Sequence, residues 1–214
     1  MGRHIAFYCI VLGLYQDLLR RQVIGCMVRY ALKMNNTQLA DYLISFLKNT
    51  VELYKRRPQG KQDVFSSKAE YIRYKKNKLK QNEFRCIEEV VLKHGVIFNV
   101  IELPKKYKKM PDKECFKNAY TLMKKHEDLT YCEGFAISEN GYPPLNHAWC
   151  VDAFKNVIDP TWDYQENGMA YFGIPFTREF TIKVYGKIKC SLLDNPKQSF
   201  PLMKEFKEEW KRSF

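Results

Sequence analysis

The spacing of apolar residues changes at Pro111, and this change restricts the fold more than any other feature of the sequence. Before Pro111, apolar residues recur mainly at the three- and four-residue spacing of amphipathic helices. After it, one helix-length segment is followed by short runs with the composition of β-strands. These runs are 131–138, 146–152, 156–159 and 180–185. The pattern predicts an α+β fold, in which a helical N-terminal region precedes a helix packed on an antiparallel sheet.

The first part of the chain is predicted to be helical over residues 5–55. Residues 35–37 interrupt the helical pattern, and Thr37 can act as the N-cap of the helix that follows. Residues 57–61 contain a proline and a glycine and form the clearest loop in the chain.

Three further elements lead toward the strands. A helix is predicted from about residue 67 to residue 93, with His94-Gly95 as its stop. Residues 96–101 are β-branched and apolar, which predicts a strand. Asp112 can cap a second helix that begins at residue 113 and ends near residue 126.

These elements divide the 214-residue chain into four parts. Residues 1–57 form a helical N-terminal region, and residues 58–110 a basic helix and a first strand that lead into the core. Residues 111–190 form the core with the candidate nucleophile, and residues 191–214 a helical tail. A chain of this length suits one domain with a helical extension.

The positive charge is confined to the first half. Residues 1–110 hold 22 Lys/Arg and 9 Asp/Glu, whereas residues 111–214 hold 14 and 15, within a formal net charge of +12. Lysine clusters at 55–80 and 105–109 carry enough charge to bind nucleic acid or another anionic surface. A solvated helix face is the favoured interpretation, because no nucleic-acid-binding motif accompanies the charge.

Seven cysteines at irregular spacing, without a CxxC pair, indicate reduced thiols rather than a disulfide framework or a zinc site. We therefore expect a cytoplasmic protein, with no metal and no cofactor. The apolar run at residues 5–15 is shorter than the roughly 20 residues that span a bilayer, so no transmembrane span is expected. A buried helix is the favoured interpretation of this run, and a membrane or targeting role is the alternative.

Cys115 is a candidate nucleophile because it falls in the first turn of the helix predicted after Asp112. Free backbone N–H groups and the helix dipole favour a thiolate at that position. The adjacent Glu114 opposes this effect. The alternative for Cys115 is a buried packing residue, which is the common role of free cysteine.

His147 is the firmest candidate for the base that serves this thiol. The chain has 4 histidines, and His126 follows Cys115 by eleven positions in the same predicted helix. That separation is about 16 Å of helix rise, too far for proton exchange. His147 begins a predicted strand, where its side chain can face the helix. A structural histidine at a strand edge is the alternative.

Asp159 is the candidate carboxylate for His147. Asp152 is closer in sequence, but it lies five positions from His147, and an odd separation on a strand points two side chains to opposite faces. A hairpin at residues 153–156 would instead bring Asp159 opposite residues 147–149. A turn at Asp159-Pro160 is the alternative explanation for this carboxylate.

Four short segments carry a family resemblance. They are Cys115-Phe116-Lys117-Asn118-Ala119, Glu133-Gly134-Phe135-Ala136, His147-Ala148-Trp149 and Asp159-Pro160-Thr161-Trp162. Together they resemble the transglutaminase-like and papain-like cysteine peptidases, and most closely uncharacterised bacterial or phage proteins with a C-F-x-N-A … H-A-W … D-P-T-W pattern. A phage origin would place the protein in the host cytoplasm.

The resemblance covers roughly residues 111–175, under a third of the chain. It implies a papain/transglutaminase-like core, with Cys115 as nucleophile, His147 as base and Asp159 as the residue that orients the base. Many members have Gly before the cysteine and Trp after it, where this chain has Glu114 and Phe116.

Four more side chains are secondary candidates, each with two interpretations. Asn118 is predicted either to donate to an oxyanion or orient the thiolate, or to satisfy a backbone group. Glu133 is predicted either to contact substrate or to lie exposed at a strand edge. Trp149 is predicted to shield the His–Asp pair from water, and Trp162 to form a wall of the cleft, with core packing as the alternative for each.

These features predict a thiol-dependent hydrolase or acyl transferase that acts on an amide or related acyl bond of a peptide, a protein or a small molecule. The alternative is a non-catalytic binding module, whose basic N-terminal half engages nucleic acid, an anionic surface or a protein partner.

Overall fold

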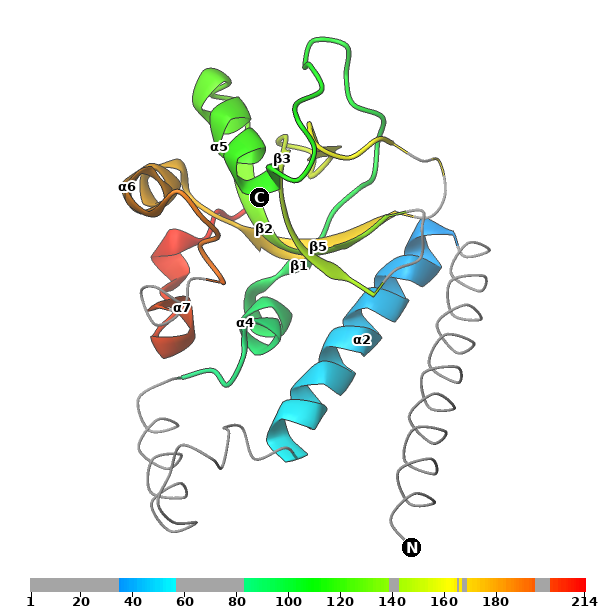
Figure 1. Ribbon diagram of the computed structural model, residues 1–214, viewed down its shortest axis with the longest axis vertical. Helices are drawn as coiled ribbons and strands as arrows, with labels where there is room; N and C mark the ends of the chain where they lie inside the picture. Colours follow the sequence, from blue (N-terminus) through cyan, green and yellow to red (C-terminus); the bar gives the residue numbers. More distant parts are fainter. Residues whose placement is uncertain (1–34, 57–82, 139–142, 165, 167–168, 195–200) are drawn as a thin grey trace, which may run out of the picture.

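The computed structural model describes residues 35–56, 83–138, 143–164, 166, 169–194 and 201–214, which are coloured in Figure 1. Predictions for the apolar run 5–15, the other residues before 35 and the basic segment 57–82 lie outside these ranges. An N-terminal helix and further helices pack on a curled antiparallel sheet of five strands, which confirms the α+β class. Within the described ranges, no helix has the length and apolar character needed to cross a membrane.

The sheet has the strand order β1-β5-β2-β3-β4, and all neighbouring strands are antiparallel. The strands are β1 (Val96–Ile97), β2 (Thr130–Ile137), β3 (Leu145–Val151), β4 (Val157–Ile158) and β5 (Ala170–Pro175). Three of the predicted runs therefore correspond to β2, β3 and β4. The predicted strand at 96–101 contributes only its first two residues as β1.

Strand β2 lies at the centre of the sheet, between β5 and β3. Side chains pack on both of its faces, so all of its residues are buried. Tyr131, Phe135 and Ile137 point into a large apolar core, whereas Cys132 and Ala136 alternate with them and point into a smaller one. This alternation is the period of two expected of a strand.

The helices build the large core. They are α2 (Asn36–Arg56), α4 (Ile87–His94), α5 (Cys115–Lys125), α6 (Arg178–Ile188) and α7 (Pro201–Lys204), with a 3-10 turn η3 (Glu208–Trp210). Helix α5 packs on β2 and β3, and α2 packs on α4 and β5 (Figure 1). Leu39, Leu43 and Leu47 of α2 are fully buried there, as their helical spacing predicts.

The strand predicted at residues 180–185 is wrong, because these residues lie within helix α6. Thr177 is the N-cap of this helix, and its hydroxyl accepts a hydrogen bond from the backbone N–H of Phe180 at 3.4 Å. A helix cap and burial of Tyr185 and Thr181 outweigh the β propensity of the aromatic and β-branched residues in this segment. The last strand is instead β5.

Two predicted N-caps are also wrong. Helix α2 begins at Asn36, and Asn35 and Gln38 exchange reciprocal hydrogen bonds of 2.9 and 3.0 Å, so Asn35 rather than Thr37 caps it. Helix α5 begins at Cys115, two residues later than predicted. The left-handed backbone of Lys113 (φ 64°) separates Asp112 from the helix, which therefore starts later. The N-cap residue is Glu114, and its side chain makes no capping bond.

Two paired glycines make room for large side chains on the smaller-core face of the sheet. Gly134 of β2 lies opposite both Gly173 of β5 and His147 of β3. A Cβ on Gly173 would lie 2.7 Å from the Trp149 indole, and one on Gly134 would lie 2.4 Å from the Gly173 Cα. Only glycine leaves space for the close packing around His147 and Trp149.

Candidate active site

Cys115 is the first residue of α5, where the backbone N–H groups of the first turn have no partner within the helix. Its side chain is half-buried. The negative charge of Glu114 was expected to disfavour a thiolate at Cys115. The Glu114 carboxylate forms an ion pair of 2.8 Å with Lys117 on the surface of the same helix. The negative charge beside Cys115 is therefore partly offset by its own ion pair.

His147 and Asp159 form a buried pair, as predicted from strand parity. The Nε2 atom of His147 lies 2.7 Å from Oδ2 of Asp159, and the two side chains are only 3% and 6% exposed. The hairpin after β3 places Cys150 opposite Ile158, so Asp159 follows directly at the end of β4. Asp152 instead accepts hydrogen bonds from Phe154 and Asn156 within that hairpin.

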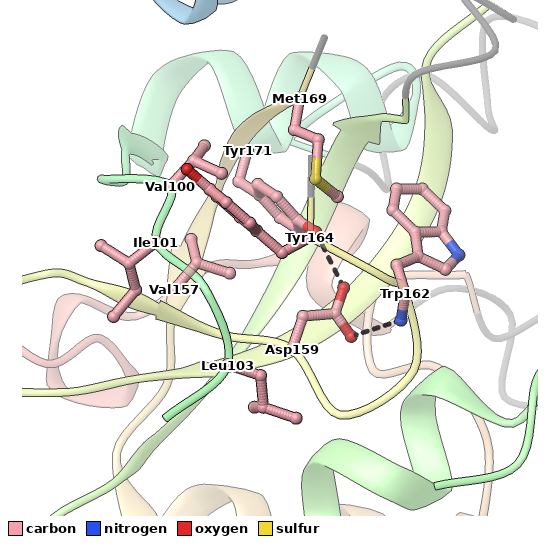
Figure 2. A pocket seen from close by; sticks show the side chains of 9 residues that line it. All are labelled: Val100, Ile101, Leu103, Val157, Asp159, Trp162, Tyr164, Met169 and Tyr171. Atoms are coloured by element: carbon pink, nitrogen blue, oxygen red, sulfur yellow. Dashed lines mark hydrogen bonds between the residues drawn. The ribbon is translucent and has the colours of Figure 1, made fainter. Parts of the chain in front are cut away.

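Four residues make hydrogen bonds with the Asp159 carboxylate, and Figure 2 shows the bonds from Tyr171 and Trp162. Oδ2 also accepts from the Tyr171 hydroxyl at 2.9 Å. Oδ1 accepts from the backbone N–H groups of Thr161 and Trp162 at 2.8 and 3.2 Å. These donors fix the orientation of the carboxylate and therefore the orientation of the imidazole that it holds.

The protonation states of this pair follow from its contacts. Burial alone lowers the pKa of His147, but the charge and hydrogen bond of Asp159, together with a hydrogen bond and charge from Cys115, raise it to about 9. Burial raises the pKa of Asp159, and the His147 imidazole and the donors around the carboxylate outweigh burial and lower it. The pair is therefore an imidazolium and a carboxylate near neutral pH, with Cys115 beside the imidazolium.

Aromatic rings cover the pair. The Trp162 ring stacks on the His147 ring, with centroids 3.8 Å apart and planes 14° apart. Trp149 lies 6.2 Å from the same imidazole and is fully buried. Trp162 is thus placed to exclude water from the His–Asp pair, whereas Trp149 belongs to the smaller core. Core packing, the alternative for Trp149, therefore fits that residue. Trp162, predicted as a cleft wall, is the residue that covers the imidazole.

Asn118 satisfies a backbone group, the second of its two predicted roles. Its amide donates to the Pro111 carbonyl at 2.7 Å and to the Thr161 hydroxyl at 3.0 Å, and its side chain is 1% exposed. Both amide N–H groups are therefore used, and neither is left for an oxyanion. Asn118 instead connects α5 to the turn that follows Asp159.

Glu133 fits neither of its predicted roles, because it lies on the central strand and is fully buried. Its carboxylate accepts hydrogen bonds from the hydroxyls of Tyr131 and Ser191 and from the backbone N–H groups of Leu192 and Leu193. These four donors satisfy the carboxylate and anchor the chain that follows α6 to the centre of the sheet.

A small hollow lies beside Asp159. Its lining includes Val100, Ile101 and Leu103 from the segment before α5, with Trp162 and Tyr171 (Figure 2). Neither Cys115 nor His147 lines it. Among the described residues, no three His, Cys, Asp or Glu side chains are grouped to hold a metal ion.

The lysine clusters are only partly described. In the cluster at 105–109, Lys106 pairs with Asp128 at 3.3 Å and Lys109 with Asp163 at 2.7 Å. Of the cluster at 55–80, only Lys55 and Arg56 are within the described residues, and Lys55 pairs with Glu52. Binding of an anionic partner by these segments stays a prediction.

Two polar groups that bind Asp159 are not among the predicted site residues. Tyr171 lies on β5, and its hydroxyl binds Asp159. The backbone N–H of Thr161 binds the same carboxylate. An Asp two residues before a Thr is a common turn pattern, so this second contact had a local signal. The Tyr171 contact had none, because it joins residues from different strands.

Comparison of the chain with models of protein families, with curated protein sequences and with solved structures found no match. The chemistry of the site must therefore be argued from its own residues.

Proposed function

We propose that this protein is a thiol-dependent hydrolase or acyl transferase that acts on an amide or related acyl bond through Cys115, His147 and Asp159. One observation carries the proposal. A buried imidazole is held at Nε2 by a carboxylate 2.7 Å away, and its pKa is raised both by that carboxylate and by a cysteine at a helix N-terminus. Nucleophile, base and orienting group in this order form the arrangement required for covalent acyl transfer.

The steps follow from the positions of the protons. Asp159 occupies Nε2 of His147, so Nδ1 is the ring nitrogen that exchanges a proton with Cys115. The Cys115 sulfur attacks the acyl carbon, and His147 donates the proton to the leaving amine or alcohol. Water or an amine then attacks the thioester, His147 takes up its proton, and the thiol is released.

A papain/transglutaminase-like core is part of the same proposal. A cysteine at the start of a helix, a histidine on a strand and an aspartate at the end of the next strand occur here in the order of that superfamily. The packing of α5 on β2 and β3 supports it.

Alkylation by iodoacetamide tests the nucleophile. We expect Cys115 to react at pH 6.5 at least about 10-fold faster than Cys190, because an imidazolium partner keeps a thiol reactive below the pH at which ordinary thiols ionise. Cys190 is the matched reference because it is also half-buried, whereas Cys86, Cys132 and Cys150 are buried. Peptide mass spectrometry of timed samples gives both rates in one tube.

The variant His147→Gln serves as the control for this mechanism. It should reduce the Cys115 rate to that of Cys190 while leaving the Cys190 rate unchanged. Equal rates for the two cysteines in the wild-type protein would rule out an activated nucleophile at Cys115.

A further inference from the structure

Acyl transfer at a cysteine needs two hydrogen-bond donors for the negative oxygen that forms when the sulfur attacks. The free backbone N–H of Cys115, at the start of α5, supplies one. Asn118, the side chain on the adjoining helix face, is fully engaged elsewhere. An element that packs against α5 can supply the second donor.

Helix α6 brings a tyrosine to this place. The Tyr185 ring stacks on Tyr120 of α5, with centroids 4.3 Å apart and planes 28° apart. It also lies 6.1 Å from the ring of Tyr131, whose hydroxyl binds Glu133. Side chains of a helix lean toward its N-terminus. The Tyr120 ring and the Tyr185 ring stacked on it therefore lie toward Cys115, the first residue of α5.

The Tyr185 hydroxyl is a donor without a partner. The side chain is 3% exposed. Among the described residues, its hydroxyl makes no hydrogen bond. The hydroxyl oxygen is not one of the fully buried side-chain atoms that lack a hydrogen-bond partner. Buried tyrosine hydroxyls normally find a partner. A tyrosine hydroxyl that has no partner among the described residues can donate a hydrogen bond to a bound substrate.

The nearby carboxylate does not consume this hydroxyl. Glu133 already accepts from Tyr131, Ser191, Leu192 and Leu193, which fills its acceptor sites. The same bonds hold the chain that follows α6, so they fix the end of the helix that carries Tyr185. Burial and the charges of Glu133, Cys190 and Cys115 raise the pKa of Tyr185 to about 12, which keeps its hydroxyl protonated and able to donate.

We propose that the Tyr185 hydroxyl is the second oxyanion donor and is a catalytic residue, acting with the backbone N–H of Cys115 on the carbonyl oxygen of the acyl substrate. This inference rests on the proposed acyl transfer at Cys115.

Two probes of Cys115 separate the inference from the proposed function. In p-nitrophenyl acetate, the Cys115 sulfur bonds to the acetyl carbon through an oxyanion, and p-nitrophenolate leaves. In iodoacetamide, the sulfur displaces iodide at a saturated carbon, and no oxyanion forms. Tyr185→Phe keeps the ring that stacks on Tyr120 and removes only the hydroxyl. We expect it to slow acetylation of Cys115 by about 100-fold and to leave alkylation by iodoacetamide within about twofold of the wild-type rate.

Tyr120→Phe is the matched control, since it removes a hydroxyl from the other ring of the stacked pair and should leave both rates unchanged. Equal urea midpoints for the three proteins show that the folds are intact. If Tyr185→Phe is acetylated at the wild-type rate, only the role of Tyr185 is overturned. The same holds if iodoacetamide alkylates the wild-type Cys115 rapidly but p-nitrophenyl acetate does not acetylate it. A wild-type Cys115 that reacts with neither probe faster than Cys190 overturns the proposed function as well.

Discussion

At the scale of single residues, the best-defined chemistry belongs to Asp159. Its carboxylate holds His147 at 2.7 Å and takes three further hydrogen bonds, from Tyr171, Thr161 and Trp162. A buried carboxylate with this many donors is stable only as an anion. The imidazolium of His147 is the counter-charge that makes burial of this anion tolerable.

The variant Asp159→Asn should remove a pH-dependent part of the stability. The pKa of His147 in the folded protein, about 9, exceeds the unfolded value of about 6.5. The proton on His147 therefore stabilises the fold fully below about pH 6.5, and this contribution disappears as pH rises through about 9. We expect the variant to lose about 3 kcal/mol more stability at pH 6 than at pH 10, measured by urea unfolding at both pH values.

Asp163→Asn provides the control for this substitution. Asp163 is four residues away and pairs with Lys109, but its side chain is 85% exposed, so its removal should change stability by less than about 1 kcal/mol at either pH. If Asp159→Asn loses the same stability at pH 6 and pH 10, the buried ion pair does not exist in solution.

At the scale of secondary-structure elements, the site depends on how α5 is fixed to the turn after β4. Asn118 connects them through the Pro111 carbonyl and the Thr161 hydroxyl. The backbone N–H of Met110 adds a bond of 2.7 Å to the Pro160 carbonyl. The element that carries the nucleophile is thus attached directly to the turn that carries the orienting carboxylate.

Asn118→Ala should weaken this attachment. It leaves a buried carbonyl and a buried hydroxyl without their donor and opens a small cavity, so we expect a loss of about 2–3 kcal/mol in urea unfolding. The rate of Cys115 alkylation should also fall, because Cys115 is no longer held against His147. The neighbouring Lys117→Ala breaks only a surface ion pair with Glu114 and should change stability by less than about 0.5 kcal/mol. A stable Asn118→Ala protein would mean that α5 is positioned by core packing alone.

At the scale of the whole molecule, the C-terminal segment closes the fold against α4 and β5. Residues Phe84 and Met203 share a backbone hydrogen bond of 2.9 Å, and the backbone N–H of Arg212 reaches the carbonyl of Pro175 at 2.9 Å. Between these points, His94 of α4 stacks on Phe206 at 4.0 Å. Its Nδ1 atom lies 2.8 Å from Glu208, and its buried Nε2 atom has no hydrogen-bond partner among the described residues.

His94 should make this closure sensitive to acid. Burial lowers its pKa and Glu208 opposes this, while Lys93 and Lys211 lower it further. Because the folded-state pKa lies below the unfolded value of about 6.5, the contribution of His94 is full above that pH and is lost as pH falls toward the folded-state value. His94→Phe retains a ring on Phe206 and removes the titrating group. We expect the variant to lose less stability than the wild-type protein between pH 7 and pH 5, as measured by urea unfolding.

His126→Gln is a suitable control, because it substitutes another histidine, the C-cap residue of α5, and should keep the wild-type acid response. The two buried histidines then act in opposite directions: His147 favours the fold at neutral and acidic pH, and His94 at neutral and alkaline pH. An identical acid response in His94→Phe and wild-type proteins would contradict the role of His94.

The sequence by itself determined the α+β class, four of the five strands (β1 only in part), and the His147–Asp159 pair. These features depend on local rules. Side chains alternate along a strand, and a four-residue hairpin reverses the chain, so the carboxylate that can reach His147 follows from counting positions.

The tertiary structure alone decided the rest. Residues 180–185 have strand-like composition, but a Thr177 cap and contacts of Tyr185 with Tyr120 and Tyr131 place them in helix α6. Glu133 is a buried anchor only because Ser191, Leu192 and Leu193, nearly sixty residues later, supply its donors. Partners so distant in the chain leave no periodic or local signal, so the hydrogen bonds of Glu133 and the placement of Tyr185 beside the Cys115 helix emerge only when the whole chain has packed.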